Sequence, residues 1–200
     1  MRARVIFGCA GLELLPEERA FFRGMQPWGF ILFARNVADR GQVRSLVSAL
    51  RETVGDANTP ILIDQEGGRV ARLKPPNWKA RPPAARFGEL HARAPDESRE
   101  AVYLNTRLIA NDLAELGINV DCLPVLDVPV EGADQVIGDR AFSRDAAVVI
   151  DLGREVIDGL IEGGVLPVMK HIPGHGRATA DTHFALPHVS ASAEDLSATD

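Results

Sequence analysis

Long apolar runs are missing from this sequence: no stretch of about 18 uninterrupted apolar residues occurs, so it predicts no transmembrane helix. Basic residues are in the minority, with 22 Lys and Arg against 28 Asp and Glu. The resulting net charge of −6 provides no basic field for a nucleic acid or a membrane surface. Cysteine is scarce, and Cys9 and Cys122 form neither a disulfide framework nor a CxxC motif. We therefore expect a cytoplasmic protein with two buried thiols and no membrane or nucleic-acid partner.

The composition is that of a globular chain. Its 200 residues are 46% hydrophobic and 25% charged, and they contain no internal repeat or low-complexity tract. The basic start, Met1–Arg4, and the apolar stretch Val5–Gly11 imitate a signal peptide. That stretch is short and is followed by Leu12 and Glu13 without a convincing cleavage site, so it predicts a first strand.

Short apolar runs alternate with helical patterns, and this alternation predicts a parallel α/β sheet. The predicted strands are Arg4–Gly8, Gly29–Phe33, Pro60–Ile63, Asn119–Leu123 and Leu166–Met169. The predicted helices are Glu17–Met25, Arg40–Val54, Glu97–Leu116 and Ala146–Ile161. Between the second and third helices, the prolines at 75–76 and 82–83 bracket a passage that we expect to be irregular.

Polar residues follow three of the predicted strands. Asp64 follows the third strand, Asp127 the fourth, and Lys170 with His171 the fifth. Because loops at the carboxyl ends of parallel strands converge at one rim, these side chains are candidates for a common site. Each aspartate taken alone could instead cap a helix or a turn.

The densest group of reactive side chains is the segment Lys170–His183, which holds three of the five histidines. Pro173, Gly174 and Gly176 interrupt any continuous helix there, so we expect a loop that leaves the fifth strand.

Three interpretations of this loop compete. A metal site would use His171, His175, Asp181 and His183, but the helical HxxxH spacing is broken by a proline and a glycine. A structural loop would hold its histidines by hydrogen bonds to the backbone. Alternatively, Asp181 could accept a hydrogen bond from one ring nitrogen of His183, because side chains two apart in an extended segment point to the same side. The second ring nitrogen would then be free to transfer a proton.

The segments Lys170–His183 and Asp64–Val70 resemble the family 3 glycoside hydrolases, and within them the bacterial cytoplasmic β-N-acetylglucosaminidases of peptidoglycan recycling. The matches run in family order from about Val5 to Val189, which is nearly the whole chain. Further matching segments are Gly29–Phe33 with Arg35 and Asn36, Pro124–Val128, Ile137–Phe142, and Leu186 with Pro187.

The resemblance implies a role for each candidate residue. The sugar-binding residues that it implies are Asp64, Arg72, Arg140, Lys170 and His171. The carboxylate would accept hydrogen bonds from sugar hydroxyls, and the cations would donate to the same sugar. His183, oriented by Asp181, would be the general acid/base that protonates the leaving oxygen and later activates water. An Asp-x-His pair also points to N-acetylglucosaminides, since family members that act on glucosides take the acid/base from a carboxylate of another domain.

The resemblance further implies a (β/α)₈ barrel and a retaining mechanism whose nucleophile is an Asp on a later strand. No residue from 184 to 200 has that strand-end setting, because Glu194, Asp195 and Asp200 look like the cap and start of a further helix. We therefore expect residues 1–200 to be the N-terminal portion of a single barrel domain, with about five of its eight strands.

The sequence thus predicts a retaining exo-β-N-acetylglucosaminidase that acts on muropeptides, with no cofactor and no metal. A catalytically inactive sugar-binding fragment and a β-glucosidase of the same family are the alternatives. Asp127 is left without an assigned role, because it could equally anchor its own loop.

Overall fold

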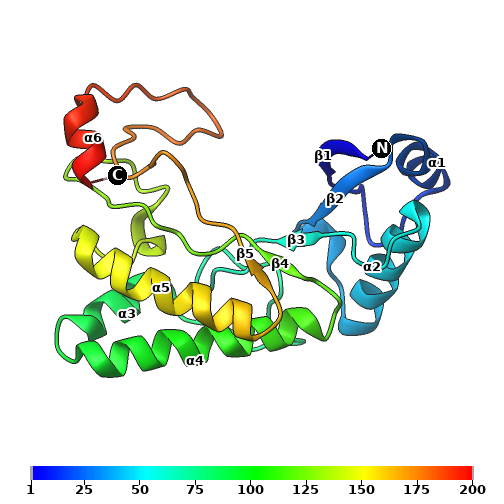
Figure 1. Cartoon of the computed structure of the whole chain (residues 1–200), viewed down its shortest axis with the longest axis horizontal. Helices are drawn as coiled ribbons and strands as arrows, with labels where there is room; N and C mark the ends of the chain where they lie inside the picture. Colours follow the sequence, from blue (N-terminus) through cyan, green and yellow to red (C-terminus); the bar gives the residue numbers. More distant parts are fainter. Residues whose placement is uncertain (1, 200) are drawn as a thin grey trace.

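The computed structural model describes residues 2–199, which form a five-stranded parallel sheet with helices packed against it (Figure 1). The strands are β1 (Ala3–Phe7), β2 (Pro27–Leu32), β3 (Ile61–Ile63), β4 (Val120–Asp121) and β5 (Leu166–Pro167). Their order in the sheet is β1-β2-β3-β4-β5. Each strand therefore lies beside its successor in the chain, as in a parallel α/β barrel, and β1 and β5 form the two edges.

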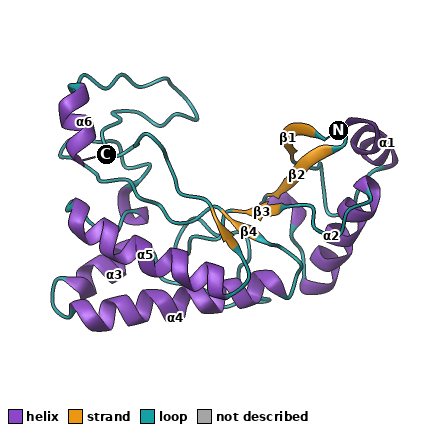
Figure 2. Ribbon diagram, viewed as in Figure 1, coloured by secondary structure: helices purple, strands orange, loops and turns teal. Residues whose placement is uncertain are grey.

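Helices connect successive strands, and one short helix follows the last strand and lies away from the sheet (Figure 2). They are α1 (Pro16–Met25), α2 (Arg40–Val54), α3 (Ala84–His91), α4 (Pro95–Ala114), α5 (Ala146–Glu162) and α6 (Ala193–Thr199), with short 3₁₀ helices η1 (Ala34–Asn36) and η2 (Gly138–Arg140). The long helices α4 and α5 pack side by side. Among the described residues, no helix combines the length and the apolar character needed to cross a membrane.

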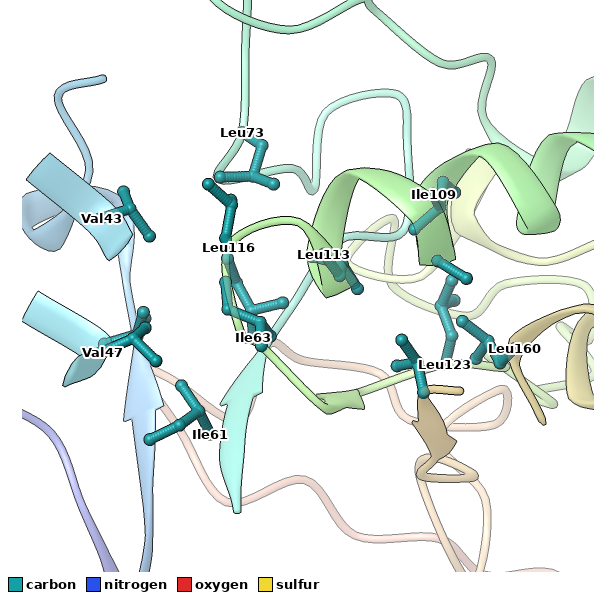
Figure 3. Close-up of a cluster of buried hydrophobic side chains, with 14 of the residues drawn as sticks. Val43, Val47, Ile61, Ile63, Leu73, Ile109, Leu113, Leu116, Leu123 and Leu160 are labelled. Carbon is teal, nitrogen blue, oxygen red and sulfur yellow. The ribbon is translucent and has the colours of Figure 1, made fainter. Parts of the chain in front are cut away.

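The main core lies between the sheet and the helices (Figure 3). Ile61 and Ile63 of β3 belong to it, together with apolar side chains of α2 and α4. Side chains alternate along a strand, so Leu62 joins a smaller cluster with Val120 and Cys122. The sheet therefore buries apolar residues on both of its faces at its centre.

All five predicted strands are confirmed, but β4 and β5 are shorter than the apolar runs that predicted them. The ladder between them pairs only Val120 with Leu166 and Asp121 with Pro167, although the amide of Val168 still donates to the carbonyl of Asp121 at 2.9 Å. The helix α4 ends at Ala114, two residues before the predicted end. Its last turn closes when the amide of Ile118 donates to the carbonyl of Leu113 (3.0 Å), and Gly117 takes a φ of 77°.

The helix α3 was not predicted. It directly follows Pro83, at the end of the passage expected to be irregular, and Gly88 lies in its middle. Glycine lowers helix propensity, and eight residues are too few to show a clear helical periodicity, so the sequence gives only a weak helix signal here. Its packing against α4 and the loop around Phe142 stabilises it instead.

Both cysteines are buried, as the sequence predicts. Burial is the main reason that the pKa of Cys9 rises to about 11 and that of Cys122 to about 12. Because the thiolate is the reactive form, neither side chain is suited to nucleophilic chemistry at neutral pH.

Candidate active site

The carboxyl ends of β3, β4 and β5 bring the predicted strand-end residues together. Asp64 follows β3 directly, and Lys170 lies three residues after β5. The pairing between neighbouring segments continues beyond the strands, since the amide of Leu126 donates to the carbonyl of Lys170 (2.8 Å) and the amide of Lys170 to that of Pro124 (3.0 Å). This extension holds the loops after β4 and β5 beside each other.

Lys170 is at the centre of a group of charged side chains. Its Nζ lies 2.9 Å from Oδ1 of Asp64 and also forms an ion pair with Glu66. The second oxygen of Asp64, Oδ2, accepts from Nη2 of Arg72 at 3.0 Å. The side chains of Lys170 and Asp64 are 12% and 18% exposed, so the group is mostly buried but open to solvent on one side.

Electrostatics keep these groups charged. Burial alone would raise the pKa of Asp64, but Lys170 and Arg72 hold that pKa below its usual value. Burial alone would lower the pKa of Lys170, whereas the carboxylates of Glu66 and Asp64 bring it above its usual value. At neutral pH the site therefore presents fixed positive and negative groups, which suits hydrogen bonding to a polyhydroxylated ligand.

A second chain of contacts joins Arg140 and His171 to the same group. Arg140 forms two parallel bonds to Glu66, with Nε to Oε2 and Nη2 to Oε1 both at 2.9 Å. Its Nη2 also lies 3.2 Å from Nε2 of His171, whose Nδ1 is 2.5 Å from Oδ2 of Asp127. The five residues that the resemblance implied for sugar binding thus meet in one cluster, linked through Glu66.

The loop after β3 is folded by the buried side chain of Gln65. Its Oε1 accepts from the amides of Arg72 and Leu73, both at 2.9 Å, and its Nε2 donates to the carbonyl of Leu73 at 3.1 Å. These bonds turn the chain back on itself, so that Arg72 lies beside Asp64 although the two residues are eight apart in the sequence.

Two glycines permit the tight turn of this loop. Gly67 and Gly68 have φ values of 98° and 55°, which favour glycine. A Cβ on Gly67 would lie 2.5 Å from the carbonyl oxygen of Pro82, and one on Gly68 2.7 Å from Cβ of Pro83. The turn therefore packs closely against the proline-containing passage that precedes α3.

Arg69 holds the segment that carries Arg140. Its Nε donates to Oδ1 of Asp139 at 2.8 Å, and its Nη2 lies within 3.0 Å of the carbonyl oxygens of residues 135–137. These contacts place η2, and with it Arg140, against the loop after β3.

Asp181 and His183 form the expected pair, with Nδ1 of His183 2.6 Å from Oδ1 of Asp181. The segment is a turn rather than extended, because the same Oδ1 also accepts from the amide of His183 (2.9 Å). The side chain of His183 is 77% exposed. Within residues 2–199, no hydrogen bond or ion pair joins this pair to the cluster around Lys170. Its catalytic role remains a prediction.

The three interpretations of the histidine-rich loop can be compared with the contacts. Among the described residues, no group of three or more His, Cys, Asp or Glu side chains is arranged to hold a metal ion. Of the four side chains considered as metal ligands, His171 is bound to Asp127, and His183 to Asp181. The Nε2 atom of His175 is buried and lacks a hydrogen-bond partner in the described chain, so this loop is not simply a set of satisfied histidines.

Two residues of the cluster were not predicted from the sequence. Glu66 lies within the segment Asp64–Val70 that carries the resemblance, but it received no role of its own. Asp127 has no predicted role although it follows a strand, and its side chain is fully buried, with contacts to His171 and the amide of His175. For both residues the available signal was position: each follows a strand whose neighbours carry candidate residues.

Comparison with solved structures confirms the barrel-type α/β fold. NagZ from Neisseria gonorrhoeae superposes with a TM-score of 0.92 and 30% identity, covering 99% of this chain and 57% of that one. The complex of the same protein with N-trifluoroacetyl-D-glucosamine also has a TM-score of 0.92 at 30% identity, over 99% of this chain and 58% of that one. A family 3 β-N-acetylglucosaminidase from Paenibacillus sp. str. FPU-7 gives 0.87 at 33% identity, over 96% and 36%.

The curated relatives are β-hexosaminidases. A β-hexosaminidase from Tolumonas auensis is 40% identical over 95% of this chain and 54% of its own length. One from Thioalkalivibrio sulfidiphilus is 38% identical over 92% and 52%. The chain thus spans about half the length of the curated relatives it matches. The family model described as the glycosyl hydrolase family 3 N terminal domain matches residues 17–200, and the chain therefore belongs to glycosyl hydrolase family 3.

Proposed function

We propose that this domain provides the sugar-binding site and the general acid/base of a retaining exo-β-N-acetylglucosaminidase. The observation that carries the proposal is the cluster in which Lys170, Asp64 and Glu66 meet at the ends of β3 and β5. Its fixed charges supply both donors and acceptors for sugar hydroxyls. Similarity to β-hexosaminidases, and to a NagZ structure with an N-acylated glucosamine, supports N-acetylglucosamine as the bound sugar.

In the proposed reaction, His183 protonates the leaving oxygen of the glycosidic bond and then activates the water that resolves the glycosyl-enzyme. Hydrogen bonds from the amide and the ring of His183 keep the pKa of Asp181 below its usual value, so Asp181 is ionised at neutral pH. The ionised Asp181 accepts from Nδ1 of His183, which leaves Nε2 free to transfer the proton. The attacking carboxylate would be an Asp on a later barrel strand, outside these 200 residues.

The natural substrate that we propose is a muropeptide with a terminal β-linked N-acetylglucosamine, cleaved in the cytoplasm during peptidoglycan recycling. No cofactor or metal is required by this mechanism, because the acid/base and the nucleophile are side chains.

The proposal is tested by release of nitrophenol from its β-N-acetylglucosaminide by the full-length protein. We expect His183→Ala to lower kcat by about 10²- to 10⁴-fold, the contribution typical of a general acid/base. His188→Ala is the matched control, since His188 is an exposed histidine on the same segment. Equal activity of His183→Ala and wild type would refute the role of His183.

Assays on the same full-length protein distinguish three alternative functions. A β-glucosidase would cleave the nitrophenyl glucoside at least as well as the N-acetylglucosaminide. A sugar-binding protein without activity would bind N-acetylglucosamine in a calorimeter and release no nitrophenol from either substrate. Activity that disappears on exhaustive chelation and returns with added metal would indicate a metalloenzyme instead.

A further inference from the structure

Asp127 is a buried carboxylate that uses both of its oxygens, and it belongs to neither the predicted sugar-binding set nor the Asp181–His183 pair. Its side chain is 0% exposed. Oδ2 lies 2.5 Å from Nδ1 of His171, and Oδ1 accepts from the amide of His175 at 2.6 Å. Burial alone would raise the pKa of Asp127, but these hydrogen bonds bring it below its usual value. One ionised group thus contacts both the sugar-binding cluster and the loop that follows it.

The contact on the other side of His171 shows which ring nitrogen carries the imidazole proton. A guanidinium has only donors, so Nε2 of His171 must accept from Nη2 of Arg140 across their 3.2 Å contact. The proton of a neutral His171 is then on Nδ1, where it is donated to Asp127. A carboxylate can only accept, so it stabilises this tautomer and excludes the other.

The tautomer in turn orients Arg140. Its Nε and Nη2 donate to Glu66, a second Nη2 hydrogen is directed at His171, and Nη1 donates to the carbonyl of Val136 at 3.2 Å. Of the five N–H groups of a guanidinium, one on Nη1 then has no partner in the described chain. If His171 carried its proton on Nε2, two donors would face each other and Arg140 would have to turn.

Asp127 also makes the first of several contacts that join residues 175–178 to residues 127–134. After the bond to the amide of His175, the amide of Val130 donates to the carbonyl of Gly176 (3.0 Å) and that of Asp134 to Ala178 (2.8 Å). A Cβ on Gly176 would lie 2.2 Å from the carbonyl oxygen of Val128, so the two segments are in close contact. Residues 175–178 are therefore fixed to residues 127–134 just before the turn that carries Asp181 and His183.

We propose that Asp127 is a positioning residue for the sugar site: it sets the tautomer of His171, and through it the orientation of Arg140. By its bond to His175 it also fixes the part of the loop that precedes the Asp181–His183 pair. This inference rests on the proposed function for its consequence in sugar binding, but the tautomer of His171 is measured independently of any substrate.

Asp127→Asn of the full-length protein separates the two contacts of the carboxylate. The amide oxygen of the variant still accepts from His175, whereas its NH₂ faces Nδ1 of His171 and forces the proton onto Nε2. We expect ¹⁵N spectra of the histidine rings to show His171 protonated on Nδ1 in wild type and on Nε2 in the variant. His171→Gln assigns the signals by their loss. N-acetylglucosamine should bind the variant roughly tenfold to a hundredfold more weakly in calorimetry, since a bond to a charged group is lost.

Asp134→Asn is the matched control, because this carboxylate of the same segment accepts from the amide of Val136 (2.7 Å). It should change neither the tautomer nor the affinity. Protonation of wild-type His171 on Nε2, an unchanged tautomer in Asp127→Asn, or measurable and equally tight binding of N-acetylglucosamine by variant and wild type would overturn the proposal. If wild type shows the Nδ1 tautomer and the variant switches it, but neither binds N-acetylglucosamine, the role of Asp127 toward His171 is supported and the proposed function fails.

Discussion

Asp121, the last residue of β4, is a completely buried carboxyl group directly behind the charged cluster. Its Oδ1 accepts from the amide of Gln65 at 3.0 Å, and Gln65 lies between Asp64 and Glu66 in the sequence. Its Oδ2 has no partner among the described residues. Burial raises the pKa of Asp121 well above its usual value, helped by Asp64 and Glu66 and opposed by the Gln65 amide and Lys170. The neutral acid is therefore the form that fits this position.

This raised pKa predicts how stability depends on pH. The folded state holds the Asp121 proton more tightly than the unfolded state does. The stabilisation that protonated Asp121 provides is therefore fully present below the unfolded pKa of 3.8, and it is lost as pH rises through the pKa of the folded state. Asp121→Asn keeps an acceptor for the amide of Gln65 and cannot ionise. We expect the melting temperature of Asp121→Asn to rise relative to wild type between pH 4 and pH 8.

Melting curves at matched ionic strength measure this difference, and Asp158→Asn, on the exposed surface of α5, controls for the change in net charge. If the difference in melting temperature between Asp121→Asn and wild type did not change with pH, Asp121 would ionise as readily in the folded protein as in the unfolded one.

At the scale of elements, α3 is held in place by a close contact at Gly88. A Cβ at this position would lie 1.7 Å from the carbonyl oxygen of Phe142, a backbone atom that cannot rotate away. Phe142 follows η2, which carries Arg140. The spacing between α3 and this loop therefore determines where one of the site's cations lies.

Gly88→Ala should consequently lower the free energy of unfolding by about 1–3 kcal/mol, as overpacking does, and should also weaken sugar binding. The control is Gly24→Ala in α1, where nothing lies within 4 Å of the added Cβ. Because alanine favours helix more than glycine, that variant should be up to about 1 kcal/mol more stable. Urea unfolding measures both, and equal effects of the two substitutions would contradict the contact at Phe142.

Elements with local end signals were predictable from the sequence. The helix α2 has the predicted bounds because Asp39 caps its start, accepting from the amide of Gln42 at 3.0 Å, and Gly55 ends it with a φ of 72°. In contrast, α3 has no such cap and depends on tertiary contacts. Propensity and periodicity, which are local, could not reveal it.

The site was predictable to a similar extent. The strand-end rule located Asp64 and Lys170, since strand ends are visible as the ends of apolar runs. Glu66 contacts Arg140, 74 residues away, and Asp127 contacts His171, 44 residues away. Such pairs depend on how two loops fold against each other, which no local pattern encodes.

At the scale of the whole molecule, the sheet is open at both edges. The chain exposes 10670 Å² of surface, whereas a compact monomer of its mass exposes about 9,200 Å². Near β1, Val5, Ile6 and Trp28 are exposed, and near β5, Leu166 and Val168. Edge strands with exposed apolar side chains pair readily with other chains. In the full-length protein, we expect further barrel strands to cover both edges.

Residues 1–200 produced alone should therefore bind the dye ANS and form oligomers in light scattering, unlike the full-length protein. Charged side chains on an edge oppose strand pairing, so Val5→Lys combined with Val168→Lys should shift the short chain toward monomer. Val189→Lys is the matched control: Val189 is 42% exposed, close to the 38% of Val5, but lies in the loop before α6 rather than on the sheet. A short chain that is monomeric and does not bind ANS, or equal effects of edge and loop lysines, would show that the apolar edges do not drive association.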